Sequence, residues 1–229
     1  MSAGDADPVA RELPTLVDAS RVRELPTTAR GVRTRQALVA AARRVFEQDG
    51  FIDSRLADIT AGANCSIGTF YTYFDTKEEI FTAVIQAAAD DMLHPGLPRV
   101  DDDLSNVAAI LDASNRAYVE AYKRNAKLNL LLEQVATIDP VFRRLRLQRG
   151  AAFAERNARW IRRLQDAGYA NPELDPYMTA RALSPILGRM AYHVFALEEP
   201  GMSEDAIIET TTTVWLNALG VARDGSKRA

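Results

Sequence analysis

The segment 54–74 restricts the possible folds of this chain more than any other part of the sequence. Ser54 and Ser66 are residues of the type that cap helix N-termini, and each precedes a short run with apolar residues at helical spacing. Thr76 and Glu79 then form a capping box that begins a further helix. Two short helices followed at once by a third are typical of a helix-turn-helix, which places one helix in the major groove of DNA.

Helix caps and breakers divide the rest of the chain in the same way, and no segment shows the alternation of a strand. Gly50 is expected to end the helix before the motif, and Asp-Pro pairs at 139–140 and 175–176 begin two others. The pattern predicts an all-α protein of about nine helices in two parts, divided near 93–102. Besides the helices of the motif and the one after it, the expected helices span about 33–49, 104–123, 128–135, 140–168, 175–197 and 203–220.

Composition argues against several classes of protein. The 229 residues are 47% hydrophobic and 26% charged, which is typical of a globular protein. The chain has neither an apolar run long enough to span a membrane nor the apolar core of a signal peptide, so we expect a cytoplasmic protein. Cys65, His94 and His193 do not form a cluster with metal-ligand spacing. We therefore expect no metal and no cofactor, and no pattern of catalytic residues predicts an enzyme.

The net charge of −3 hides a basic segment just before the motif. Residues 21–48 hold seven arginines and two glutamates, a local excess of positive charge that suits contact with DNA phosphates. Within this segment we predict DNA contacts for Arg33 and Arg35. The alternative is that these arginines form only a solvated tail and helix face.

The second helix of the motif has residues suited to DNA on its outer face. Phe70 and Phe74 lie one turn apart and are expected to anchor the helix to the core. Gly68 allows the backbone to approach a phosphate closely, and Tyr71 and Lys77 are expected to hold phosphates. Hydroxyl-bearing side chains on the outer face, those of Thr69, Thr72 and Tyr73, are expected to reach base edges or thymine methyl groups.

A wider set of residues around the motif shows a family pattern. Its members are Phe46, Gly50-Phe51, Asp58-Ile59, Ala63, Ser66, Gly68-Thr69-Phe70-Tyr71, Tyr73-Phe74, Lys77-Glu78-Glu79 and Phe81. With these residues, the run 33–81 resembles the DNA-binding domain of the tetracycline-repressor (TetR) family of bacterial regulators. The resemblance implies a homodimer with a three-helix DNA-binding domain, placed at 31–92, and a ligand-binding and dimerisation domain, placed at 103–222. It also implies a repressor that a small molecule releases from DNA. Residues 1–30, which contain prolines and scattered charges, are expected to be a flexible arm.

Four residues depart from the usual choices of that family. Asn64 replaces the turn glycine, and asparagine is the next best residue for a left-handed backbone, so the turn should hold. Cys65 replaces valine and is expected to be a small buried residue, with a redox switch as the alternative. Ile67 replaces a common lysine and Arg55 a common serine, so the operator of a relative cannot be transferred. The complete set of predicted DNA contacts is Arg33, Arg35, Ser54, Arg55, Ser66, Ile67, Gly68, Thr69, Tyr71, Thr72, Tyr73 and Lys77.

The long helix predicted at 140–168 has Arg149 and Arg156 among apolar residues at helical spacing. A buried guanidinium needs a partner, which is either an internal acid such as Glu133 or an acidic ligand, for example a carboxylate or an acyl-coenzyme A phosphate. Tyrosines at helical spacing within 104–123 are either ordinary core residues or orient a ligand in an apolar pocket. The predicted ligand contacts are Asn115, Tyr118, Tyr122, Gln134, Arg149, Arg156, Trp160 and Arg189.

The helices predicted at 175–197 and 203–220 are apolar on more than one side. Two sides of each helix must therefore be buried, so we expect one side to face its own domain and the other a partner subunit. Two helices from each subunit would then form a symmetric interface. His193 is expected to be an interface residue, with a pH or ligand contact as the alternative. The predicted dimer contacts are Ile186, Met190, His193, Ile207, Thr211, Val214, Trp215 and Ala218.

These features predict a ligand-responsive transcriptional regulator that acts as a homodimeric repressor. A small hydrophobic or acidic effector is expected to release it from a palindromic DNA operator. Two alternatives stay open, a transcriptional activator of the same fold and a nonspecific architectural DNA-binding protein. The effector, the operator, the regulated genes and the sign of regulation are not determined by the sequence.

Overall fold

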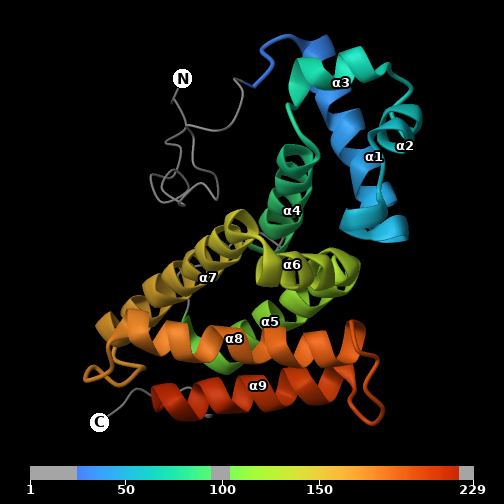
Figure 1. Ribbon diagram of the computed structural model, residues 1–229. Helices are drawn as coiled ribbons and strands as arrows, with labels where there is room; N and C mark the ends of the chain where they lie inside the picture. Colours follow the sequence, from blue (N-terminus) through green and yellow to red (C-terminus); the bar gives the residue numbers. More distant parts are fainter. Residues whose placement is uncertain (1–24, 94–103, 222–229) are drawn as a thin grey trace, which may run out of the picture.

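The computed structural model describes residues 25–93 and 104–221, and in these residues every regular element is a helix (Figure 1). The predicted all-α fold is therefore confirmed. Most of the predicted arm at 1–30 and the predicted division near 93–102 lie outside the described residues. The helices are α1 (Ala29–Asp53), α2 (Leu56–Gly62), α3 (Ile67–Tyr73), α4 (Lys77–Leu93), the short 3-10 helix η3 (Leu104–Asn106), α5 (Val107–Arg124), α6 (Ala126–Ile138), α7 (Pro140–Asp166), α8 (Pro176–Phe195) and α9 (Glu204–Leu219).

Side-chain caps begin three of the later helices at the predicted positions. The carboxylate of Asp139 accepts a hydrogen bond from the backbone N–H of Val141 at 2.7 Å, and that of Asp175 accepts one from Met178 at 2.6 Å. The hydroxyl of Ser203 accepts the corresponding bond, of 3.2 Å, at the start of α9. Because these bonds satisfy backbone donors that a helix leaves unpaired, short local sequences fix where the helices begin.

Figure 1 shows α1, α2 and α3 together at one end of the molecule, with α8 and α9 side by side at the other. Helix α4 leads from the first group towards the second, and it contacts α1 as well as α5, α6 and α7. Helix α7 packs on α6 and α8, whereas α9 packs on α5 and α8. None of the described helices is both long and apolar enough to cross a membrane.

The hydrophobic core continues from the helix-turn-helix unit into the second half of the chain. Phe51 at the end of α1, Phe81 of α4 and Phe142 of α7 pack ring against ring, with centroids 4.7, 5.2 and 5.4 Å apart. Phe81 and Phe142 are completely buried. Tilted and edge-on ring pairs of this kind add to the stabilisation that burial itself provides. The aromatic cluster therefore joins the first helices of the chain to α7.

Candidate DNA-binding surface and ligand pocket

The turn between α2 and α3 has the predicted left-handed backbone. Asn64 has a φ of 51°, a conformation that asparagine adopts more readily than other residues with a side chain. The next residue, Cys65, packs partly buried against the core. Burial raises the pKa of the Cys65 thiol, which disfavours the thiolate that redox chemistry requires. The environment of Cys65 is thus that of a small packing residue.

Helix α3 is fixed at its start and along its inner side. The Ser66 hydroxyl accepts a hydrogen bond from the backbone N–H of Thr69 at 3.1 Å and lies 3.0 Å from the Thr69 hydroxyl oxygen. Phe70 and Phe74 are buried, as the sequence predicted. A short helix held in this way has little freedom to reorient, which is what sequence recognition requires.

Four residues form the exposed face of α3, which we call the recognition face: Ile67, Gly68, Tyr71 and Thr72. Ile67 remains 49% exposed and Tyr71 47% exposed, large fractions for side chains that are mainly apolar. The Thr72 hydroxyl donates to the carbonyl oxygen of Gly68 at 3.3 Å, which orients its methyl group and oxygen on this face. The recognition face thus offers methyl, aromatic and hydroxyl groups, all of which can contact base edges or phosphates.

Tyr73 does not belong to the recognition face, and its predicted outward orientation is wrong. It packs partly buried against the core, and its hydroxyl oxygen lies near Gly31 at the start of α1. Helical periodicity explains the difference, because Tyr73 follows Phe70 by three residues and therefore shares the inner side of α3.

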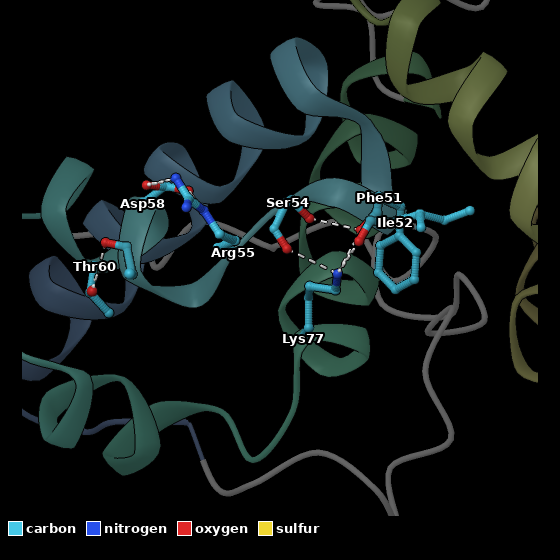
Figure 2. Close-up of polar contacts among 8 residues, drawn as sticks. Phe51, Ile52, Ser54, Arg55, Asp58, Thr60 and Lys77 are labelled. Atoms are coloured by element: carbon cyan, nitrogen blue, oxygen red, sulfur yellow. Dashed lines mark hydrogen bonds and ion pairs between the residues drawn. The ribbon is translucent and has the colours of Figure 1, made fainter.

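Lys77 has a structural role that the sequence did not predict. Its ammonium group donates to the carbonyl oxygens of Phe51, Ile52 and Ser54 at 2.7, 3.0 and 3.0 Å, as Figure 2 shows. These bonds use all three of its N–H donors and satisfy carbonyl groups at the end of α1. The predicted phosphate contact of Lys77 is therefore wrong in this structure, because no donor remains for a phosphate.

Ser54 is also turned inward. It is 4% exposed, and its hydroxyl donates to the carbonyl oxygen of Phe51 at 2.8 Å (Figure 2). It therefore ends α1 instead of capping α2, and its predicted phosphate contact is wrong. The residue before α2 is Arg55, whose side chain makes no capping bond.

The three predicted arginines differ in their surroundings. Arg33 is exposed and makes no ion pair within the described residues. Arg35 lies over the ring of Phe74 at 5.0 Å, and burial lowers the pKa of its guanidinium. Arg55 is mostly exposed and pairs with Asp58 at 2.8 Å (Figure 2). Among the three, Arg33 has the guanidinium most available to a phosphate.

A cavity of about 450 Å³ lies between α5, α6, α7 and α8. Its volume falls in the range of pockets for small molecules. Of the predicted ligand contacts, Tyr118, Tyr122, Arg149 and Arg189 line it. The other lining residues are Asn129, Leu132, Glu133, Arg146, Leu147, Gly150, Phe153, Ala154, Arg181, Ser184, Pro185, Gly188 and Tyr192.

The other four predicted ligand contacts lie outside this pocket. The Asn115 amide donates to the Thr212 hydroxyl at 2.9 Å and joins α5 to α9, and Gln134 is exposed on α6. Trp160 packs against Trp215 with ring centroids 6.5 Å apart. Helical spacing predicts which side chains share one side of a helix, but not which element packs against that side. The side chains of Asn115 and Trp160 meet the core, and that of Gln134 meets solvent.

Arg156, the fourth of these residues, contacts the end of α4. It donates to the carbonyl oxygen of Leu93 at 2.9 Å and to the side-chain oxygen of Asn157 at 3.3 Å. Its predicted alternative, pairing with an internal acid, is not seen among the described residues, because both partners are neutral. Arg156 thus binds the last residue of the helix that leads from the helix-turn-helix.

The pocket has more positive than negative charge. Four arginines line it with one glutamate, and that glutamate, Glu133, pairs with Arg146 at 2.7 Å. Arg149 was expected to have Glu133 or a ligand as its partner. Its one hydrogen bond to the described residues is instead to the sulfur of Met92 in α4, at 3.3 Å. Burial lowers the pKa of the Arg149 guanidinium, and the charge of Glu133 offsets this effect only in part.

Of the α8 residues that line the pocket, the sequence predicted only Arg189. Arg181, Ser184, Gly188 and Tyr192 lie at spacings of three or four residues and therefore share one side of this helix. The sequence reading treated the helix as apolar on nearly every side. The polar and small residues at this spacing were the signal that would have identified the pocket wall.

Three predicted dimer contacts are buried inside the chain. Ile207, Thr211 and Trp215 of α9 are 1%, 0% and 5% exposed and are covered by other helices of the same chain. Their prediction as interface residues is wrong, because the inner side of α9 faces α5 and α8. The predicted residues that keep exposed area are Val214 and Ala218 and, in part, Ile186, Met190 and His193.

A helix-turn-helix with an exposed recognition face, joined to helices that enclose a ligand-sized pocket, defines a DNA-binding regulator. Residues 38–84 match the family of bacterial regulatory proteins of the tetR type, and residues 111–220 match the C-terminal domain of the transcriptional regulator EthR. The chain belongs to the TetR family of transcriptional regulators. The match over residues 111–220 extends the family assignment beyond the helix-turn-helix.

Individual relatives agree with this assignment. The chain is 24% identical to the regulator EthR of Mycolicibacterium smegmatis over 80% of its own length and 84% of the relative. It is 29% identical to the repressor BepR of Brucella suis over 56% of its length and 65% of the relative. Among solved structures, a TetR-family regulator from Rhodococcus sp. has a TM-score of 0.70 at 18% identity, covering 82% of this chain and 98% of that one. SmeT, the repressor of a Stenotrophomonas maltophilia multidrug efflux pump, has a TM-score of 0.65 at 19% identity, covering 85% and 95%.

Proposed function

We propose that this protein is a homodimeric repressor that binds a palindromic operator and leaves it when a small molecule occupies the pocket. The proposal assigns DNA binding to residues 31–92 and ligand binding and dimerisation to residues 103–222. BepR and SmeT are both named as repressors, which supports the same sign of regulation here. The recognition face would contact bases, and Arg33 and Arg55 would contact phosphates.

The main support for this proposal is the set of contacts that α4 makes at its two ends. At its first residue, Lys77 donates to three carbonyl groups around the end of α1. At its last two residues, Met92 accepts a hydrogen bond from Arg149 and Leu93 accepts one from Arg156. One rigid helix is therefore bonded both to the helix-turn-helix unit and to a residue of the pocket wall, so a ligand that moves Arg149 also changes a contact of α4.

Such a link produces regulation only if the ligand binds the two conformations of the protein unequally. The ligand must bind more tightly to the conformation in which the dimer cannot contact both half-sites of the operator, and it then lowers the affinity for the operator. Bound DNA lowers the affinity for the ligand by the same factor. A change of about tenfold corresponds to a coupling of about 1.4 kcal/mol, which is within the usual range for such proteins.

We propose the outer sides of α8 and α9 as the dimer interface. Val214 and Ala218 lie one turn apart on the exposed side of α9, and Ile186 lies partly exposed on α8. Four helices, two from each subunit, would give a symmetric interface in which each patch meets its own copy. Val214→Glu should then give a monomer in light scattering, while Lys127→Glu on α6 should leave the dimer unchanged. A dimer that survives Val214→Glu and Ala218→Glu contradicts this interface.

Footprinting on DNA that flanks the protein's own gene tests the proposed function. We expect protection of one palindrome whose half-sites lie about one or two helical turns apart. In vitro transcription from that promoter should fall when the protein is added. Protection without sequence preference contradicts the proposal in favour of an architectural protein, and increased transcription contradicts the assigned sign.

A further inference from the structure

The wall of the pocket contains more unpaired positive charge than a neutral ligand would require. Arg146 is paired with Glu133, but Arg149, Arg181 and Arg189 have no carboxylate within ion-pair distance among the described residues. Arg181 and Arg189 are exposed and Arg149 is partly buried, so an unpaired charge is costly mainly at Arg149. An excess of one sign in a pocket raises the local concentration of ligands of the opposite sign. The charge pattern indicates an anionic ligand.

Arg149 is the arginine whose surroundings are least satisfied. A guanidinium has five N–H donors, and its one hydrogen bond to the described residues goes to the sulfur of Met92, a weak acceptor. The side chain is partly buried in the pocket wall, and burial lowers the pKa of the guanidinium. Several donors of Arg149 therefore remain for a ligand, in a position where water competes poorly.

Neutral polar groups surround Arg149. The Tyr118 hydroxyl, which also lines the pocket, makes no hydrogen bond to the described residues. The side-chain oxygen of Asn129 is buried without a partner, while its amide nitrogen donates to the sulfur of Met92 at 3.7 Å. A hydroxyl donor beside a guanidinium can satisfy the two oxygens of a carboxylate, whereas the Asn129 oxygen is an acceptor and cannot pair with them.

The rest of the wall is apolar and suits a hydrophobic body. Phe153 packs edge-on against Tyr118 with ring centroids 5.7 Å apart, and Leu132, Leu147 and Pro185 also line the cavity. We propose that the pocket binds an amphipathic carboxylate whose head group pairs with Arg149 and whose apolar body lies against Phe153 and Leu132. This deepens the proposed function by naming the chemical class of the effector, and it rests on that function only for the consequence of binding.

The ligand-free protein offers a first test. If Arg149 is kept for a ligand, replacing it with methionine removes an unpaired buried charge, so Arg149→Met should raise the Tm. Arg144→Met, on the exposed side of the same helix, should leave the Tm nearly unchanged. An Arg149→Met variant that folds with a lowered Tm overturns the proposal, because it would give Arg149 a structural role.

Ligand selectivity offers a second test, which needs no variant. A panel of straight-chain, aromatic and polycyclic carboxylic acids, each with its primary amide, is titrated against the wild-type protein by calorimetry. We expect at least one acid to bind about tenfold to hundredfold more tightly than its amide, as the loss of a charge-assisted hydrogen-bonded pair predicts. This preference should disappear in Arg149→Met, persist in Arg144→Met and be partly restored in Arg149→Lys. A panel in which no acid binds better than its amide overturns the proposal.

DNA-binding measurements separate this inference from the proposed function. An acid that binds through Arg149 but leaves operator affinity unchanged contradicts the regulatory role and supports the pocket chemistry. Specific operator binding together with equal affinities for acids and amides contradicts the pocket chemistry alone.

Discussion

In the helix-turn-helix unit, several polar side chains bond to the backbone of that same unit, whereas three of the four arginines that line the pocket have no acidic partner among the described residues. Lys77 binds three carbonyl groups, and the hydroxyls of Ser54 and Ser66 each have a backbone partner. In the pocket, Arg149 has one weak acceptor, and the Asn129 oxygen has no partner among the described residues. The two regions thus differ in whether their hydrogen-bonding capacity is used within the fold.

This difference agrees with what each region is proposed to bind. A surface that reads DNA must hold its few contacting groups in fixed positions, so its other polar groups serve the fold. A pocket that binds a polar ligand must keep donors available, which costs stability in the free protein. Four measurements, from the largest expected effect to the smallest, test this contrast.

The largest effect is expected from the aromatic cluster, where the two regions share a core. Phe142→Ala removes a completely buried ring that contacts Phe51 and Phe81 and should lower the free energy of unfolding by about 3–5 kcal/mol. Urea unfolding is followed by tryptophan fluorescence, which reports on α7 and α9, and by circular dichroism, which reports on all helices. Val141→Ala, at a neighbouring 38% exposed position, is the control.

A shared core predicts that both signals of the wild type change at the same urea concentration. Separate transitions in the wild type would mean that the helix-turn-helix unit unfolds by itself. The contrast between the regions would then extend to their stability.

The next effect concerns the internal bonding of the DNA-binding region. Lys77→Ala removes the donor from the carbonyl groups of Ile52 and Ser54 and leaves that of Phe51 with only the Ser54 hydroxyl, so it should lower the free energy of unfolding by about 2–3 kcal/mol. Lys127→Ala, an exposed lysine on α6, should change it little. If the Lys77→Ala variant is instead as stable as the wild type and its operator binding depends less on salt, Lys77 contacts a phosphate. The contrast between an internally bonded helix-turn-helix unit and the pocket would then be wrong.

A smaller effect should separate base reading from phosphate contact. Thr72→Ala should change the relative affinities for operator variants by about 1–2 kcal/mol, because Thr72 lies on the recognition face. Arg33→Ala should weaken binding to all sequences alike and reduce the slope of log affinity against log salt by about 1. Fluorescence anisotropy at several salt concentrations measures both. Similar effects of the two changes would mean that the recognition face is wrongly assigned.

The smallest effect is a pH dependence at the junction between α4 and α5. Burial raises the pKa of the Asp91 carboxyl, but hydrogen bonds from Arg124 and Asn125 outweigh it, and the net shift is downward. Because the pKa of Asp91 is lower in the folded state, its ionised carboxylate stabilises the fold at pH values above the unfolded-state pKa of about 3.9. This stabilisation is lost as the pH falls through the folded-state pKa. Asp91→Asn should therefore cost less than about 1 kcal/mol at pH 7, since the pair is partly exposed.

The difference between the Asp91→Asn variant and the wild type should shrink as the pH falls below the unfolded pKa. Asp166→Asn, on the exposed end of α7, is the matched control. A difference that stays constant from pH 7 to strongly acidic pH would mean that the Asp91 charge does not stabilise the junction.

Sequence patterns identified the features that depend on neighbours along the chain. The Ser66 cap, the left-handed Asn64 and the Asp139 and Asp175 caps all involve bonds or angles within a few residues, and the structure confirms each. Ser54 failed as a predicted cap because its hydroxyl bonds backward to Phe51 instead of forward into α2. A serine before a helix can do either, and the path of the chain at the end of α1 decides.

The all-α fold, the helix-turn-helix and the family could thus be predicted from the sequence, because they follow from local propensities and from residues at fixed spacing. Tertiary structure alone decided that Lys77 binds carbonyl groups more than twenty residues earlier, and that Arg149 faces the pocket while Arg156 meets Leu93. It also decided which side of α9 is buried. The physical reason is that helical spacing fixes which residues share a side, whereas the packing of whole helices fixes what each side meets.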